Sequence, residues 1–181
     1  MTEVSDRYTA VADGFTRRLD GAESHWTDQS PCEDWKARDV AAHVIRTNRA
    51  VKARANGVEP EAVAEDEDLG EAWRRASSAV KDALADSDKA GAIVGGMFGE
   101  QSFERLVGTL VCADTLVHTW DLARATGQDE HLDPEAVTAA SEFLETLDDK
   151  IRAPGGFGPK IDPPVGADAQ TIFLCFTGRT P

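Results

Sequence analysis

The stretch between Ser102 and Gly127 limits the possible folds of this chain more than any other part of the sequence. Its apolar residues recur at helical spacing over most of its length, which predicts one face of a long helix. Gly108 is its only glycine, and it contains no proline. The apolar residues on this face are Phe103, Leu106, Val107, Leu110, Val117 and Leu122. A helix of this length must bury its apolar face against other elements of the fold.

Three earlier stretches show the same spacing. Val4, Tyr8, Val11, Phe15 and Leu19 predict a first helix. A second helix is expected over about residues 36–55, before Gly57, and a third around residues 72–83. With the stretch described above, these helices supply the partners that a helical bundle needs.

The remaining segments predict additions to that bundle. Asp133 and Pro134 predict the start of a further helix, because Asp caps a helix and Pro suits its first turn. Residues 93–98 lie among glycines and are expected to be irregular or extended. Residues 154–181 begin with glycine and proline and predict a wrapping tail with a short helix around Ile172.

These patterns predict an all-α fold, a four-helix bundle with an additional C-terminal helix and a wrapping tail. A chain of 181 residues is enough for one domain of ordinary size, so we expect a single domain over residues 1–181. Its core covers about residues 1–127, and residues 128–181 form the C-terminal extension.

Composition excludes several classes of function. No apolar run approaches the roughly 20 residues that span a bilayer, and a net charge of −14 repels nucleic acids and anionic membranes. The first residues lack the pattern of a secretory signal, so a cytoplasmic location is expected. Three cysteines without a CxxC motif argue against a disulfide framework. The sequence leaves open whether the protein is a monomer or a homodimer.

Polar residues interrupt the apolar faces of two predicted helices. Asp114, His118 and Asp121 continue the apolar phase of the stretch between 102 and 127, and His43 interrupts the second helix in the same way. A buried carboxylate or imidazole is costly unless it is paired or bound to a metal. If these helices are neighbours, then His43, Asp114 and His118 form a metal site with positions open for water or substrate.

Other interpretations of these residues stay open at this point. A histidine on an apolar face is often a hydrogen-bonded core residue without a ligand. Asp121 could fix the orientation of His118, or it could pair with Arg124 or Arg38. Two histidines and two cysteines are not assigned to the site, because His25 and His131 are expected at the surface and Cys32 and Cys112 are expected to pack as small apolar residues.

Four segments resemble a known family. Residues 30–43, SPCEDWKARDVAAH, resemble the TPC-x-x-W-x-V-R-D-L-x-x-H signature of the mycothiol-dependent maleylpyruvate isomerase N-terminal domain group within the DinB-like superfamily. Residues 114–127, DTLVHTWDLARATG, resemble its second signature. Residues 157–159, FGP, and 177–181, TGRTP, are similar to the tail of an actinobacterial metal-binding subgroup.

The resemblance implies a DinB-like four-helix bundle that holds a divalent metal, usually zinc, on His43, Asp114 and His118. The isomerase has glutamate where this chain has Asp114, and its own C-terminal domain is not resembled here. The leading hypothesis is therefore a mycothiol-type transferase or isomerase that joins a small thiol to an electrophile, with Asp121 orienting His118. The rivals are a metal-binding stress or storage bundle without catalysis and a metal-free helical interaction module.

Overall fold

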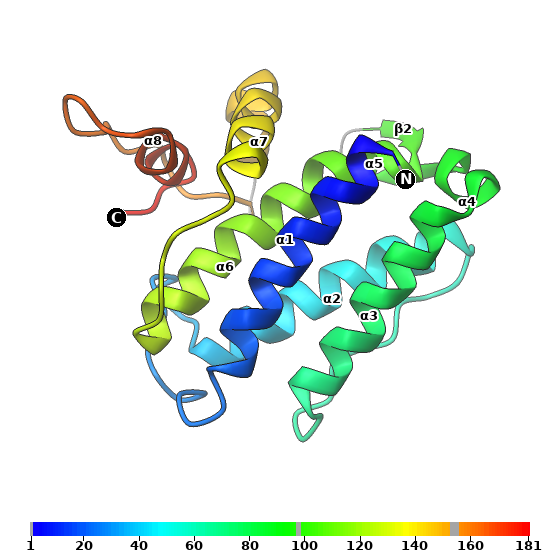
Figure 1. Cartoon of the computed structure of the whole chain (residues 1–181), viewed down its shortest axis with the longest axis horizontal. Helices are drawn as coiled ribbons and strands as arrows, with labels where there is room; N and C mark the ends of the chain where they lie inside the picture. Colours follow the sequence, from blue (N-terminus) through cyan, green and yellow to red (C-terminus); the bar gives the residue numbers. More distant parts are fainter. Residues whose placement is uncertain (1, 97–98, 153–155) are drawn as a thin grey trace.

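The computed structural model describes residues 2–96, 99–152 and 156–181, and its architecture is helical (Figure 1). Helices α1 (Glu3–Asp20), α2 (Ala37–Ala55), α3 (Leu69–Ala85) and α6 (Cys112–Thr126) pack side by side as a bundle. The helix α1 contacts α3 and α6, and α2 contacts the same two helices. The predictions of an all-α fold and of a four-helix bundle are therefore confirmed.

Local sequence signals set the ends of these helices. The Thr2 hydroxyl accepts a hydrogen bond from the Ser5 N–H and caps α1. Asp133 caps α7 (Pro134–Leu147), with Pro134 in the first turn as predicted. The helix α6 ends at Gly127, which adopts a φ of 66°, a left-handed conformation that favours glycine.

The long helix predicted from Ser102 is not regular. It begins as α5 (Phe103–Leu106), continues through a π-helical turn, η1 (Val107–Val111), and then becomes α6. Gly108 lies in this turn against Val4, where a Cβ atom would come within 2.8 Å of the Val4 side chain. The Arg7 guanidinium donates a hydrogen bond to the Gly108 carbonyl at 3.2 Å. The π-helical turn thus packs against Val4, and the Arg7 side chain donates to one of its carbonyls.

A small hairpin precedes this helix. After the short helix α4 (Ser87–Gly91), strands β1 (Ile93–Gly96) and β2 (Gly99–Ser102) pair antiparallel, with Ile93 opposite Ser102. The expectation of extended structure is confirmed for Ile93 and Val94. Met97 and Phe98, which belong to the same predicted stretch, lie outside the described residues.

Aromatic side chains fill the interior of the bundle. Trp73, Trp120, Tyr8 and Phe15 are buried completely or almost so. The polar atoms of two of them are paired, since the Tyr8 hydroxyl donates to Asn48 Oδ1 at 2.7 Å and the Trp73 ring N–H donates to the Thr16 hydroxyl at 2.8 Å. No helix among the described residues is both long enough and apolar enough to cross a membrane.

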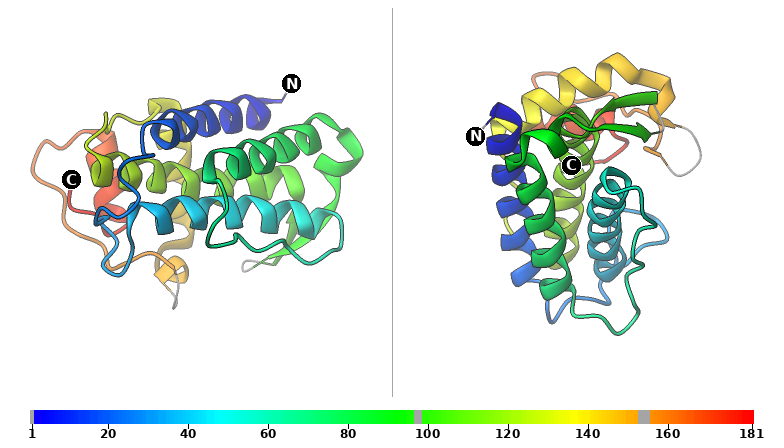
Figure 2. Two further views of the ribbon diagram at one scale, coloured as in Figure 1. Left: turned by 90° about the horizontal axis from the view of Figure 1, so that it is seen from below. Right: turned by 90° about the vertical axis from the view of Figure 1, so that its right-hand side faces the viewer.

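The C-terminal extension returns to the bundle. The helix α7 crosses the bundle helices at a steep angle and packs against α6 (Figure 2). It is followed by the short 3₁₀ helix η2 (Asp148–Arg152) and by α8 (Ala169–Phe176), which packs on α7. Residues 177–181 then form the last segment, which we call the C-terminal tail. Gly178 in this tail has a φ of 82°, and a Cβ atom there would meet the Pro159 carbonyl at 2.9 Å.

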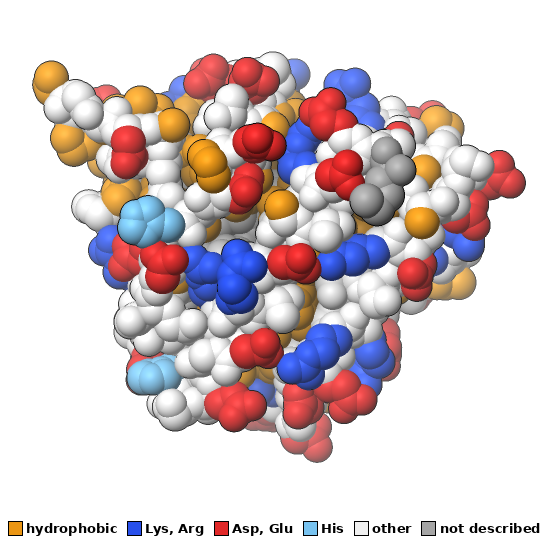
Figure 3. Space-filling model, viewed as in Figure 1, with side chains coloured by type: hydrophobic (Ala, Val, Ile, Leu, Met, Phe, Trp, Pro, Cys, Tyr) orange, Lys and Arg blue, Asp and Glu red, His pale blue; other side chains and the backbone are white. Residues whose placement is uncertain are grey.

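Acidic and basic side chains are interspersed on the face of the molecule shown in Figure 3. Most of the described ion pairs are at least partly exposed. Such pairs contribute little to stability, about 0–1 kcal/mol each. Among the described ion pairs, Arg49–Glu67, His118–Asp121 and Arg179–Asp121 are the most buried, and the last two belong to the cluster described next.

Candidate metal centre

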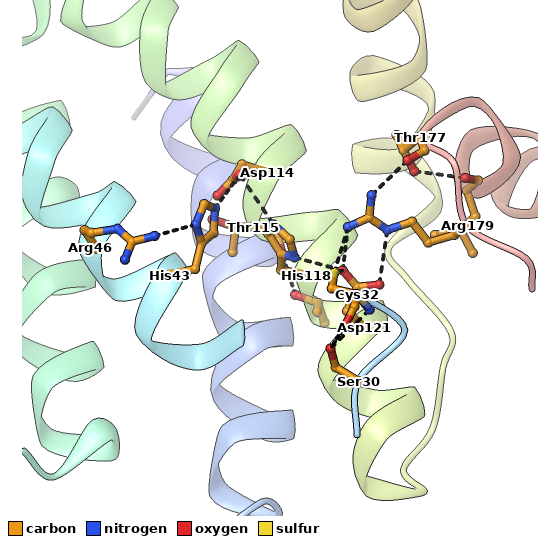
Figure 4. Close-up of polar contacts among 12 residues, drawn as sticks. Ser30, Cys32, His43, Arg46, Asp114, Thr115, His118, Asp121, Thr177 and Arg179 are labelled. Atoms are coloured by element: carbon orange, nitrogen blue, oxygen red, sulfur yellow. Dashed lines mark hydrogen bonds and ion pairs between the residues drawn. The ribbon is translucent and has the colours of Figure 1, made fainter. Parts of the chain in front are cut away.

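The helices α2 and α6 bring the three predicted metal ligands together (Figure 4). His43 lies on α2, and Asp114 and His118 lie one turn apart on α6. Asp114 Oδ1 is 3.0 Å from His43 Nε2 and 3.7 Å from His118 Nε2. The two imidazole rings have centroids 4.6 Å apart. The predicted metal site required these two helices to be neighbours. The contacts between α2 and α6 meet that requirement.

The spacing of these atoms suits a metal ion. A tetrahedral ion about 2.1 Å from each ligand atom needs ligand atoms about 3.4 Å apart, and the two measured distances from Asp114 Oδ1 lie on either side of that value. The second oxygen, Oδ2, is buried and has no hydrogen-bond partner among the residues that the structure describes. A carboxylate with one oxygen next to two imidazole nitrogens and the other oxygen buried and unpaired fits a site that holds a cation.

Asp114 is ionised in this arrangement. Burial opposes its ionisation, but the hydrogen bond with His43, the electrostatic interaction with His43 and His118 and a hydrogen bond with Thr47 hold its pKa below the ordinary value. A metal ligand must be deprotonated, so the environment already favours the form of Asp114 that binds a cation.

Asp121 fixes the orientation of His118. Its Oδ2 atom accepts a hydrogen bond from His118 Nδ1 at 2.8 Å, which leaves the Nε2 lone pair directed at the cluster. Burial would raise the pKa of Asp121, but the hydrogen bond from His118 and the charges of His118 and Arg179 lower it to about 2. A carboxylate–histidine pair of this kind is the usual support of a histidine that binds a metal.

The cation that pairs with Asp121 comes from the C-terminal tail. Arg179 donates to Asp121 through Nη2 at 2.7 Å and through Nε at 3.2 Å. The two alternatives suggested by sequence are engaged elsewhere: Arg124 pairs with Glu130, and Arg38 donates to backbone carbonyls of the segment before α3. The structure therefore assigns Asp121 to both His118 and Arg179, and the pairing with Arg124 or Arg38 is wrong.

His43 has a different proton arrangement. Arg46 Nη2 lies 3.0 Å from His43 Nδ1, and because a guanidinium can only donate, this nitrogen accepts. The proton of neutral His43 then lies on Nε2 and is shared with Asp114. Binding of a metal through Nε2 requires that proton to move to Nδ1, which would turn a donor toward Arg46. The exposed Arg46 side chain must then rotate away.

Two residues near the cluster were not singled out from the sequence pattern. Trp35 stacks on His118 with ring centroids 5.6 Å apart and also lies 4.9 Å from the His43 ring. Arg179 is the other. Both belong to segments that resemble the family, and that membership is the only signal in the sequence that points to them.

The expectation for Cys32 needs correction. Its thiol is half-buried among polar groups, 3.5 Å from Asp121 Oδ2 and 3.5 Å from Arg179 Nη2, so it does not pack as a small apolar residue. Burial and the nearby Asp121 charge raise its pKa to about 11. The thiol is therefore protonated at neutral pH and a poor nucleophile.

The other residues left out of the site lie where they were expected. Cys112 is buried, the His131 side chain is 92% exposed, and His25 is partly exposed and paired with Asp28. Cys32, His118 and Asp121 form a second group that could hold a metal. Arg179 contacts two of its members, so a cation already occupies that side of the group.

A cavity of about 450 Å³ lies at the metal cluster. The three predicted ligands line it, together with Trp35, Cys32, Arg179, residues 156–158 and Gly178. A cavity of this volume is in the range of small-molecule sites. The cluster is therefore accessible to a small molecule.

Comparison with known proteins gives a family. Residues 7–123 match the family described as the mycothiol maleylpyruvate isomerase N-terminal domain. Two uncharacterized proteins, from two strains of Mycobacterium tuberculosis, are each 33% identical over 159 residues, which cover 83% of this chain and 83% of the relative. No solved structure matches the chain. With the helical fold and the family match over the bundle, this chain belongs to the mycothiol maleylpyruvate isomerase N-terminal domain family.

Proposed function

We propose that this protein is a metal-dependent transferase or isomerase that uses a low-molecular-weight thiol of the mycothiol type. The observation that carries the proposal is the convergence of His43, Asp114 and His118 at a cavity, with Asp114 Oδ2 buried and unpaired among the described residues. Two imidazoles and one carboxylate are a ligand set used by catalytic zinc, and three protein ligands leave one tetrahedral position open. We therefore propose zinc as the ion.

When bound, the ion would supply a site that lowers the pKa of the thiol and holds it as a thiolate. The side chains around it have separate roles. Asp121 holds His118 in the tautomer that presents Nε2, and Arg179 holds Asp121 ionised. Trp35 covers one side of both imidazoles and limits the access of water. The adjoining cavity of about 450 Å³ would receive the thiol.

The family supports the thiol part of this proposal. Its description names mycothiol, and the matched residues 7–123 contain the three proposed ligands and Asp121. Asp114 is shorter by one methylene than the glutamate expected from the resemblance. The close contacts of Asp114 with both histidines favour a ligand role for the shorter side chain.

Metal analysis tests the ligand set. We expect about one zinc ion per chain in the wild type, and His43→Ala or His118→Ala should remove most of it because either change leaves two protein ligands. His131→Ala is the matched control, since His131 is an exposed histidine that does not line the cavity at the cluster. Full zinc content in both site variants would refute the ligand set.

A rate measurement tests the chemistry. Zinc-loaded protein should accelerate the conjugation or isomerisation of an electrophile only when mycothiol is present, and the chelated protein should not. If the protein binds zinc through these residues but shows no thiol-dependent rate across a broad set of electrophiles, it is a metal-binding bundle without catalysis.

A further inference from the structure

A second cavity, of about 260 Å³, lies beside the first. Its wall is largely apolar and includes Val51 of α2, Leu110 and Val111 of the π-helical turn, and Leu144 of α7. A cavity of about 150 Å³ holds a benzene molecule. This one therefore has room for a substituted aromatic ring or a short aliphatic chain.

The two cavities meet at the proposed metal centre. Asp114, Gly156 and Phe157 line both of them. A molecule in the smaller cavity and a molecule in the larger one would thus each reach the same carboxylate from different sides. A reaction between a thiol and an electrophile needs two adjacent binding places of this kind, because the reacting atoms must be held close together.

One charged side chain contributes to the smaller cavity in addition to Asp114. Arg54, in the last turn of α2, lines it and is exposed. Among the ion pairs of the described residues, none involves Arg54, although the chain has a net charge of −14 and many carboxylates. A guanidinium at the edge of an apolar cavity is suited to a ligand with an apolar body and a carboxylate at one end.

We propose that this cavity binds the electrophilic substrate, and that this substrate is a small aryl or short-chain carboxylate whose charged end pairs with Arg54. The assignment of the ligand as the electrophile rests on the proposed function. The binding of such a carboxylate does not, because the wall of the cavity consists mainly of residues other than the metal ligands.

Phenylpropionate and phenylpropanol are suitable probes, since they share an apolar body and differ in charge. Isothermal titration calorimetry of the wild-type protein should show saturable binding of both. Arg54→Gln should weaken phenylpropionate binding by about fivefold, as expected for a partly exposed ion pair, and leave phenylpropanol binding unchanged. Lys52→Gln, which removes a neighbouring charge of α2 outside the cavity lining, should change neither.

A second variant tests the place of binding. Ala50 lines the cavity, and Ala50→Phe should fill it and abolish binding of both probes. Absence of saturable binding by the wild type, equal effects of Arg54→Gln on the two probes, or full binding by Ala50→Phe would overturn the proposal.

Repeating the titrations with chelated protein separates this proposal from the proposed function. Binding of phenylpropionate that survives chelation supports the cavity and leaves the metal centre to be judged by the zinc content of the untreated protein. An untreated protein that binds phenylpropionate but neither contains nor takes up zinc supports the cavity and refutes the metal chemistry. A protein that binds zinc through His43 and His118 but neither probe supports the metal centre and refutes the cavity assignment.

Discussion

The buried ion pair between Asp121 and the C-terminal tail should be the most costly polar interaction to disrupt near the site. Asp121 is completely buried, and its two oxygens accept from His118 at 2.8 Å and from Arg179 at 2.7 and 3.2 Å. Asp121→Asn keeps the shape but places an amide N–H against one of these donors. It also leaves Arg179 buried beside a neutral group.

Two arguments give the size of the effect. Removal of one partner from a buried ion pair costs about 3–5 kcal/mol. The pKa of Asp121 is about 2 and its ordinary value is 3.8, a difference that corresponds to about 2.5 kcal/mol of stability. We therefore expect Asp121→Asn to lower the free energy of unfolding by about 3 kcal/mol at neutral pH.

The same pKa fixes the pH dependence. A carboxyl group whose pKa is lower in the folded state stabilises the protein above its unfolded pKa and loses that effect as the pH falls. The contribution of Asp121 should disappear as the pH falls from about 3.8 toward about 2. Asp121→Asn should lack this part of the acid-induced loss of stability.

Urea unfolding of a double-mutant cycle is the assay. Asp121→Asn, Arg179→Met and the double variant should not be additive, because the second change removes a charge that the first has left unpaired. We expect the double variant to be more stable than the sum of the single effects predicts, by about 1–3 kcal/mol. Additive effects, or an Asp121→Asn variant as stable as the wild type, would refute the buried pair.

Three further predictions concern other parts of the molecule. Arg46→Gln should tighten zinc binding in a competition titration, because a glutamine oxygen can accept from His43 Nδ1 whereas Arg46 can only donate; weaker binding would contradict this. Burial raises the pKa of Tyr8, the only tyrosine, well above its ordinary value of 10. Burial of the neutral Tyr8 side chain therefore stabilises the fold fully below pH 10, and this stability is lost as the pH rises further; tyrosinate absorbance should appear only as the protein unfolds. Gly178→Ala should lower the free energy of unfolding by more than the about 1–2 kcal/mol that a positive φ costs, because its Cβ would also meet the Pro159 carbonyl; Gly166→Ala, also at positive φ but with open space around it, should show the backbone cost alone in the same urea titration.

Helical phase accounts for the part of the site that sequence predicted correctly. Asp114, His118 and Asp121 were expected to face the interior because they continue an apolar pattern on their own helix, and their positions relative to one another follow from helix geometry alone. His43 required one further assumption, that α2 packs on α6. That packing follows from the small number of ways in which four amphipathic helices can bury their apolar faces.

The π-helical turn could not be predicted in this way. An isolated glycine inside a helical pattern is usually tolerated, so Gly108 carried no clear signal of a change in the turn. What requires a glycine at this position is the close approach of Val4, more than a hundred residues earlier in the chain. Its consequence is local to the site, since Leu110 and Val111 of this turn line the second cavity.

The role of Asp121 beside His118 was predicted from sequence, but its cationic partner is Arg179, which is neither of the two arginines that sequence left open. Of those two, Arg124 lies three residues later on the same helix. Its guanidinium instead lies over the Trp120 ring at 4.6 Å and pairs with Glu130 near the surface. A fully buried carboxylate needs a cation that can reach it through the interior. The C-terminal tail is not helical, so its backbone can place Arg179 beside Asp121, whereas Arg124 is held on the surface side of α6. The position of Arg179 depends on Gly178, whose positive φ and close contact with the Pro159 carbonyl allow the tail to turn inward. To find the partner of a buried carboxylate such as Asp121 from sequence, one would therefore look for a basic residue that follows a glycine in a non-helical segment, as Arg179 follows Gly178.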